Sequence, residues 1–329
     1  MDARGAVNRA SKALAFFRQD SEDPCYQYPR PWRLASAPYY LVEGFDNSDG
    51  HGGYASICRF DREGVPYISA GRGRDRYHPL VVARYVLRMF SLGALTGDAR
   101  AYAAAECAAA ALARAGAPTG VWRPGWSPDD MSGGVPSCII QGSAISALVR
   151  VEKRNPGLIS NDVLRRALNV LVAPAAAGGT VTHGLGGPFL EEFHSLSHVL
   201  NGCVYGLWAL YDLIDGLGCC ELTPLAESVE SCLAQLVPQF TMSNGWSLYA
   251  LDTYGYAPIA SIHYHRSHIR MFTLLRARTG RTAYGDAVER WERALNSRAV
   301  KCTVLARKCA QVVWMRDVRR LPLVNDIWA

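Results

Sequence analysis

From Tyr77 onward, the sequence alternates helix-length apolar repeats with long loops rich in glycine and proline, and this alternation restricts the fold more than any other feature. Within each repeat, the apolar residues recur at the spacing of one helical face. Helices are predicted over residues 79–95, 100–114, 143–152, 161–172, 199–215, 222–236, 266–278 and 284–296. Paired helices whose connecting loops can gather at one rim are typical of an α/α barrel, so we predict a mainly α fold of this type.

The first part of the chain has a different character. Residues 1–76 are rich in proline, glycine and aromatic residues, and the short runs Tyr54–Phe60 and Val65–Ser69 have the composition of strands. We therefore predict a small, irregular and β-rich N-terminal region over residues 1–76 and an α/α-barrel catalytic domain over residues 77–300. Residues 301–329 form a C-terminal tail, basic and then apolar, to which the sequence assigns no role.

Composition excludes several classes of protein. With 329 residues, 49% of them hydrophobic, the chain can bury a large core and is not intrinsically disordered. The formal net charge of +6 is mild and no run of Lys or Arg is present, so we expect no nucleic-acid partner. Most of the 35 basic residues are arginine, which suits bidentate contact with carboxylate or sulfate and fits an acidic partner.

Cysteine usage and apolar runs bear on the environment of the protein. The ten cysteines form no C-x-x-C pair and several lie in apolar helical patterns, so they are predicted to be buried thiols rather than disulfides or zinc ligands. The start of the chain, Met1–Arg18, has no signal-peptide pattern. The best membrane-span candidate, Val199–Gly218, contains Asp212 and Asp215, so we expect a buried helix, no membrane span and a cytoplasmic protein.

Three clusters of polar and aromatic residues are candidates for chemistry, and they cover residues 189–212, 245–249 and 261–269. No phosphate-binding glycine loop, G-x-S-x-G elbow or H-E-x-x-H motif accompanies them. His265 and His268 are spaced as a metal pair could be, but no partner carboxylate is evident, so we favour hydrogen-bonding roles and predict no metal.

The order of these motifs resembles that of the D-glucuronyl C5-epimerase C-terminal domain. Glu191–Leu213 reads E-E-aromatic, a short loop, and then V-L-N-G-x-x-Y-x-L-x-x-L-Y-D-L. The segment W-S-L-Y ending at Tyr249 resembles the catalytic tyrosine strand of that family, and Tyr264-His-x-x-His268 resembles its tyrosine–histidine element. Tyr77-His-Pro-Leu80 and Gln141-Gly-x-x-Ile-Ser146 match upstream in the same order, so the resemblance spans residues 77 to 296.

The resemblance implies an enzyme that converts D-glucuronate to L-iduronate in an acidic polysaccharide such as heparosan or heparan sulfate. It also implies a homodimer that needs no cofactor. Inversion removes a weakly acidic proton from C5 and returns one from the other face, through an enediolate that carries extra negative charge. Such a site needs a base and an acid on opposite faces of the ring, and cationic or hydrogen-bonding groups at the carboxylate.

Residue roles follow from the same resemblance. Tyr249 and Tyr264 match catalytic tyrosines, and a tyrosine can act as a base only if its pKa falls well below about 10. A third tyrosine position is occupied by Phe193, which cannot transfer a proton. Glu192 and His194 are therefore predicted to be catalytic as well, and His198 is an alternative.

Substrate binding is assigned to polar and aromatic residues near these motifs. Where the family has an arginine after the first catalytic tyrosine, this chain has Asp252, so another arginine must bind the carboxylate. The predicted substrate-binding residues are Arg266, His265, His268, Asn201, Trp126, Arg123, Arg74 and Gln141.

Two other functions fit parts of the same pattern. A polysaccharide lyase begins with the same removal of the C5 proton and then eliminates the substituent at C4. An inactive glycan-binding module would fit the departures at Phe193 and Asp252. Structural explanations also remain for single motifs: Glu191-Glu192 could begin a helix, Tyr249 could be a strand core residue, and Asn201-Gly202 could be a turn.

Overall fold

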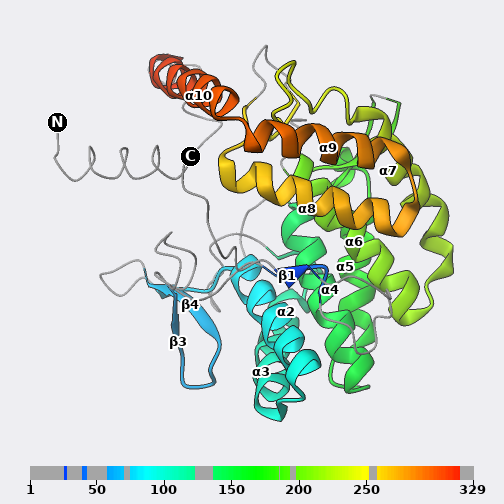
Figure 1. Ribbon diagram of the computed structural model, residues 1–329. Coiled ribbons are helices and arrows are strands. Elements are labelled where there is room, and N and C mark those ends of the chain that lie inside the picture. Colours follow the sequence, from blue (N-terminus) through cyan, green and yellow to red (C-terminus); the bar gives the residue numbers. More distant parts are fainter. Residues whose placement is uncertain are drawn as a thin grey trace.

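A computed structural model of the chain has a mainly helical fold with three small sheets (Figure 1). The structure describes residues 26–27, 39–42, 58–69, 75–122, 136–184, 186–192, 198–251 and 258–318. The mainly α prediction is thereby confirmed, whereas closure of the helices into a barrel stays a prediction.

Nine α-helices carry the body of the described chain. They are α2 Pro79–Thr96, α3 Ala99–Gly116, α4 Cys138–Arg154, α5 Asn161–Val172, α6 Leu200–Leu217, α7 Thr223–Leu236, α8 Ile262–Thr279, α9 Thr282–Asn296 and α10 Arg298–Val318, with short 3-10 turns η3 Ala175–Ala177 and η4 Cys220–Leu222. Left-handed glycines end several of them, as Gly97 does for α2 with a φ of 72°.

The sheets are short and antiparallel. Strands β1 Tyr26–Gln27 and β2 Leu41–Val42 pair with each other, β3 Cys58–Phe60, β4 Pro66–Ser69 and β5 Asp75–Arg76 form a sheet in that order, and β6 Val181–Gly184 pairs with β7 Gly187–Leu190. Strands β3 and β4 lie in the two runs predicted to be strands. In the register of β6 and β7, Val181 is opposite Leu190. The end of β7 lies next to α4 and α6, because Leu190 and Cys138 of α4 both lie close to Gly206 of α6.

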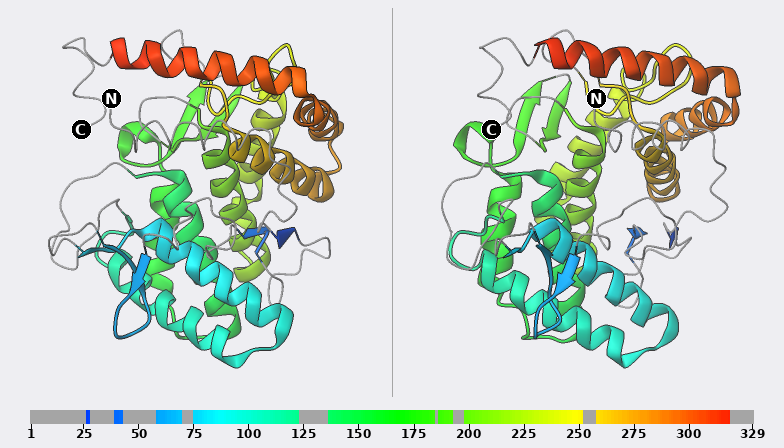
Figure 2. Two further views of the ribbon diagram at one scale, coloured as in Figure 1. Left: turned by 60° about the vertical axis from the view of Figure 1, so that its left-hand side comes forward. Right: turned by 90° about the vertical axis from the view of Figure 1, so that its left-hand side faces the viewer.

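Helices α4 and α6 form the centre of the molecule and pack against each other (Figures 1 and 2). Both are buried around nearly their whole circumference, as expected of core helices. Gly142 makes their close approach possible, because a Cβ atom there would lie 2.6 Å from the carbonyl oxygen of Tyr205. Among the described residues, α2 is the one helix whose length and composition would also suit a membrane span, but more than half of it is buried inside the protein.

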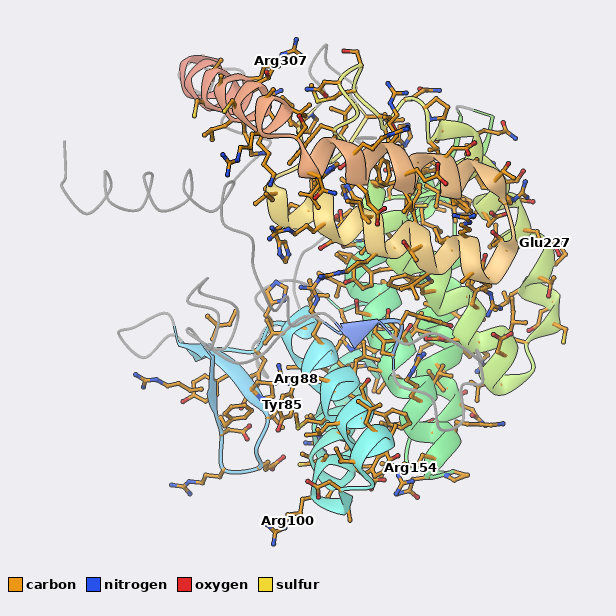
Figure 3. All side chains as sticks on the ribbon, viewed as in Figure 1. Tyr85, Arg88, Arg100, Arg154, Glu227 and Arg307 are labelled. Carbon is orange, nitrogen blue, oxygen red and sulfur yellow. The ribbon has the colours of Figure 1, made fainter. Side chains whose placement is uncertain are left out.

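Outer helices cover this centre in pairs. Helix α2 packs on α3 and α4, and α9 lies along α8 on another side (Figures 1 and 2). The β3–β4 hairpin lies beside α2, where Tyr85 packs against Phe60 with 5.2 Å between the ring centroids (Figure 3).

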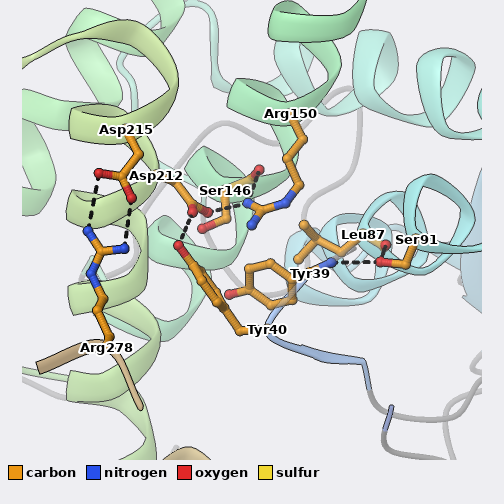
Figure 4. Close-up of polar contacts among 9 residues, drawn as sticks. All are labelled: Tyr39, Tyr40, Leu87, Ser91, Ser146, Arg150, Asp212, Asp215 and Arg278. Carbon is orange, nitrogen blue, oxygen red and sulfur yellow. Dashed lines mark hydrogen bonds and ion pairs between the residues drawn. The ribbon is translucent and has the colours of Figure 1, made fainter. Parts of the chain in front are cut away.

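A buried polar network joins the segment at Tyr39 and Tyr40 to the central helices (Figure 4). Arg150 of α4 forms an ion pair with Asp212 of α6, and both side chains are almost completely buried. The Tyr40 hydroxyl donates a hydrogen bond of 2.6 Å to Asp212, and the Arg150 guanidinium lies 4.7 Å from the centre of the Tyr39 ring. A buried ion pair of this kind is costly to disrupt, so the network fixes residues 39–40 against the core.

Two segments differ from the sequence-based expectation. Residues 173–187 have the Gly, Ala and Pro content of a loop, but they contain η3, β6 and the first residue of β7. Their Gly, Ala and Pro content favours a loop locally, and the strand forms through its pairing with β7. The sequence assigns no role to the tail over residues 301–329, and in the structure α10 runs to Val318 and packs against α9.

Candidate active site

Three of the four predicted catalytic residues meet although they come from distant segments. Glu192 follows β7, Tyr249 precedes α8, and Tyr264 lies in the first turn of α8. The Tyr249 hydroxyl lies 3.5 Å from Oε2 of Glu192, at the long limit of a hydrogen bond. The Tyr249 and Tyr264 rings pack with their centroids 4.7 Å apart. The fourth residue, His194, lies outside the described residues.

Backbone hydrogen bonds hold Tyr249 on both sides. Its N–H donates to the carbonyl of Pro258 at 2.7 Å, and its carbonyl accepts from the N–H of Leu200 at 3.0 Å. Tyr249 is thus fixed between the start of α6 and the segment that leads into α8. On α8, the Ser261 hydroxyl caps the helix by accepting from the N–H of Tyr264, so both tyrosines are anchored.

A glycine makes room for the carboxylate. A Cβ atom on Gly202 would lie 2.9 Å from both Cβ and Oε2 of Glu192. Such a distance is too short for a real contact, so a side chain at position 202 would push Glu192 away. Gly202 at the start of α6 therefore leaves the space that Glu192 occupies. The neighbouring Asn201 is buried, and its Oδ1 has no hydrogen-bond partner among the described residues.

Desolvation sets the electrostatics of the cluster. Burial raises the pKa of Glu192 to about 7, although the charge of Arg84 and the hydrogen bond from Tyr249 oppose the rise. Burial also raises the pKa of Tyr249 well above its usual value, and the Glu192 charge adds to this. A catalytic tyrosine base needs a shift in the other direction. Tyr249 therefore keeps its proton, and Glu192 is the group that can change protonation near neutral pH.

Arg84 was not predicted from the sequence. It lies on α2, its guanidinium lies 5.5 Å from the centre of the Tyr205 ring, and its charge acts on Glu192. It also lowers the pKa of His78, which is already lowered by burial. The motif Tyr77-His-Pro-Leu80 at the start of the same helix was the nearest signal, but it gave no reason to choose Arg84.

Behind the tyrosines, two histidines share one serine. Nδ1 of His265 accepts from the N–H of Ser247 at 3.1 Å, and its Nε2 donates to the carbonyl of Trp291 at 3.1 Å. The ring is fully buried and stacked on Trp246, and burial lowers its pKa to about 3. Because both ring nitrogens are used by the protein, this geometry suits the positioning of Ser247 rather than contact with a substrate.

Three further predicted binding residues, His268, Gln141 and Arg266, lie in the described part of the chain. His268 lies beside the cluster, with Nδ1 2.9 Å from the Ser247 hydroxyl and its ring 6.4 Å from that of Tyr264. Gln141 is fully buried, and its amide is bound by the backbone of Trp122 and Gly120 at 2.8 Å each, so it holds that loop. Arg266 is half-buried on α8.

A family model matches the part of the chain that carries this cluster. The model of the D-glucuronyl C5-epimerase C-terminus family matches residues 120–293, which is more than half of the chain and includes Glu192, Tyr249 and Tyr264. The chain belongs to this family. Membership identifies it as a carbohydrate epimerase.

A solved structure shows a similar fold. Cellobiose 2-epimerase from Bacillus thermoamylovorans B4167 superposes with a TM-score of 0.53, over 74% of this chain and 67% of that chain. With 10% sequence identity, the likeness concerns the fold alone. A search of the curated proteins found no match.

Phe193 and Asp252, where the chain departs from the family pattern, lie outside the described residues, as do the predicted binding residues Trp126, Arg123 and Arg74. Within the described part of the chain, no three His, Cys, Asp or Glu side chains are grouped as metal ligands would be.

Proposed function

We propose that this carbohydrate epimerase inverts C5 of a hexuronic acid, converting D-glucuronate to L-iduronate within an acidic polysaccharide. One observation carries the proposal. The Glu192 carboxyl group, with a pKa of about 7, lies 3.5 Å from a phenol whose own pKa is raised. A base titrating near neutral pH is suited to removing a weakly acidic proton.

In this mechanism, Glu192 removes the C5 proton and the electron pair moves into the substrate carboxylate, which becomes an enediolate. The Tyr249 phenol keeps its proton and can donate a hydrogen bond to the negative charge that develops. Tyr264 packs on Tyr249 and fixes the orientation of its ring. The site thus offers a base and a hydrogen-bond donor side by side.

Arg84 is the candidate for binding the substrate carboxylate. The carboxylate is attached to C5, so a group that neutralises it must lie near the base that takes the C5 proton. Arg84 meets this requirement because its charge acts directly on Glu192. A guanidinium is well suited to a planar carboxylate, and it would stabilise the enediolate more than the ground state. Arg266 and the Asn201 amide are further candidates along the polymer.

Substrate and assembly follow the family. We propose a glucuronate-containing glycosaminoglycan of the heparosan or heparan sulfate type, and a homodimer acting in the cytoplasm without a cofactor.

The test is product analysis with heparosan oligosaccharides and the wild-type protein. We expect L-iduronate signals in the NMR spectrum and no new absorbance at about 230 nm. An unsaturated uronate absorbs there, and it would form if removal of the C5 proton were followed by elimination at C4. Rising absorbance would identify a lyase instead. Binding of the polymer without any chemical change would identify a glycan-binding module.

A further inference from the structure

The Ser247 side chain links the segment that carries Tyr249 to the helix that carries Tyr264. Ser247 lies two residues before Tyr249 and is fully buried. Its Oγ is 2.8 Å from Nδ1 of His265 and 2.9 Å from Nδ1 of His268, and both histidines belong to α8. One hydroxyl group, which has a single proton, therefore contacts two ring nitrogens on the neighbouring helix.

The direction of the first hydrogen bond follows from an acceptor that cannot donate. Nε2 of His265 lies 3.1 Å from the carbonyl oxygen of Trp291, so the ring proton of His265 is on Nε2. Burial lowers the pKa of this histidine to about 3, so the ring is neutral and Nδ1 has no proton. Nδ1 accepts from the N–H of Ser247, and it must also accept from the hydroxyl group, because two lone pairs would otherwise face each other at 2.8 Å.

The proton of His268 is fixed by the same reasoning. Since the hydroxyl proton of Ser247 is given to His265, the oxygen can only accept at its second contact, so Nδ1 of His268 donates to it. Burial lowers the pKa of His268 well below its ordinary value, so the ring is neutral and Nε2 has no proton. Nε2 has no hydrogen-bond partner among the described residues, which suits an unprotonated nitrogen, because a buried N–H without a partner is rare.

His268 in turn borders the two tyrosines of the site. Its ring is fully buried and lies 6.4 Å from that of Tyr264, one helical turn earlier, with 30° between the ring planes. The Tyr264 ring packs on that of Tyr249 at 4.7 Å, and the Tyr249 hydroxyl lies 3.5 Å from Glu192. A continuous chain of contacts thus runs from Ser247 through His268 and the two phenols to the carboxylate.

We propose that Ser247 is a positioning residue of the epimerase, and that it acts through a one-way hydrogen-bond chain from His268 to Ser247 to His265. The inference rests on the proposed function, because it gives this chain the task of holding the two tyrosines beside Glu192. A one-way chain admits one orientation of the hydroxyl group and one tautomer for each histidine, so neither ring can flip without breaking it. Both histidines then support the tyrosines from behind and do not contact the substrate.

The first test does not depend on activity. Long-range proton–nitrogen NMR spectra of protein with isotope-labelled histidine rings distinguish the two neutral tautomers of each ring. We expect opposite tautomers, with the proton of His265 on Nε2 and that of His268 on Nδ1. Spectra of His268→Gln identify the His268 signals by their loss. Two rings with the same tautomer, or a charged ring at neutral pH, would overturn the chain and leave the proposed function standing.

The second test removes the hydroxyl group. Ser247→Ala leaves Nδ1 of His268 without its acceptor, so the His268 proton should no longer be confined to one nitrogen. With a heparosan oligosaccharide, we expect kcat for C5 exchange to fall by about 10- to 100-fold, as for misplaced reacting groups, with little change in KM. The matched control is Ser143→Ala, which removes a buried hydroxyl group of α4 that has no hydrogen-bond partner in the described part of the chain. It should match the wild type in kcat and in both tautomers.

A second pair of variants covers the case in which Ser247→Ala does not fold. Asparagine can place an N–H group at the position of Nδ1 and glutamine at that of Nε2, so His268→Asn should keep a higher kcat than His268→Gln. Equal kcat in these two variants would overturn the role of the chain.

The outcomes separate this inference from the proposed function. A Ser247→Ala protein with the kcat of the wild type, or one in which KM alone changes, would overturn the positioning role while the wild type still inverts the uronate. A wild-type protein that neither inverts nor exchanges any uronate would overturn the proposed function, and the positioning role with it, whatever the tautomers.

Discussion

Glu192 is the residue whose chemistry depends most on its surroundings. An isolated glutamate has a pKa of 4.5, and burial raises that of Glu192 to about 7. Between these values the folded protein keeps a proton that the unfolded chain has lost, so the contribution of Glu192 to stability falls as pH rises through this window. Above it, the carboxylate is ionised and can act as a base.

We therefore expect wild type and Glu192→Gln to differ in the pH dependence of unfolding. Relative to the variant, the wild type should lose stability between about pH 4.5 and 7 and change little more above that range. Chemical denaturation at several pH values measures this. Parallel stability curves for the two proteins would show that Glu192 is not buried as described.

Tyr249 provides a second prediction at this scale. Tyr249→Phe removes a hydrogen-bond donor from the reacting centre, so C5 exchange should fall by about 10²- to 10⁴-fold. Its hydrogen bond also lowers the pKa of Glu192, so the midpoint of the pH–rate profile should move upward in the variant.

The control for Tyr249→Phe is Tyr102→Phe on α3, which lies on a helix that carries none of the site residues. It should leave both the rate and the midpoint unchanged. An unaltered midpoint in Tyr249→Phe would contradict the hydrogen bond to Glu192.

At the level of elements, the sequence predicted most helices but not the first turn of α8, which carries Tyr264. Apolar periodicity is strong in α2 to α7, and their predicted ranges overlap the observed ones. Helix α8 was predicted from residue 266, but the Ser261 cap starts it at Ile262, which places Tyr264 on a helix. Motif order was enough to associate Glu192, Tyr249 and Tyr264. Arg84 and the raised pKa of Tyr249 depend on contacts between distant segments, which no local pattern contains.

Helix α10 is hydrogen-bonded to the segment next to Tyr249 although it lies beyond the family match. Lys308 donates to the Ile259 carbonyl at 2.6 Å, and Gln311 accepts from the Ile259 N–H at 3.4 Å. Ile259 is bridged to Leu248, the residue before Tyr249. The helix thereby holds the segment that is paired with the chain just before Tyr249.

Lys308→Met should loosen this segment. It leaves the Ile259 carbonyl without its donor, a loss of about 1–3 kcal/mol in the free energy of unfolding, and kcat should fall while the pH profile stays the same. Lys308→Arg should restore part of both. The matched control is Arg307→Met, since Arg307 is exposed and projects from α10 (Figure 3). Equal stability and equal kcat in Lys308→Met and Arg307→Met would contradict the proposed support of Ile259 by Lys308.

Across the whole molecule, the buried network at Arg150 ties the N-terminal segment to the two central helices. Arg150→Met would leave the Asp212 carboxylate buried without its cation, so the free energy of unfolding should fall by about 3–5 kcal/mol. Adding Asp212→Leu should recover much of that loss, because the uncompensated charge is then gone. Denaturant titrations of both variants test this, and a double variant less stable than Arg150→Met would contradict it.

The proposed mechanism depends above all on the Glu192 carboxylate, whose raised pKa suits it to remove the C5 proton of a uronate. The most direct measurement is the rate at which deuterium enters C5 of a heparosan oligosaccharide in deuterated water, for wild type and Glu192→Gln. We expect rapid incorporation by the wild type and a rate about 10²- to 10⁴-fold lower in the variant, since glutamine cannot accept the proton. Equal incorporation by the two proteins would contradict it.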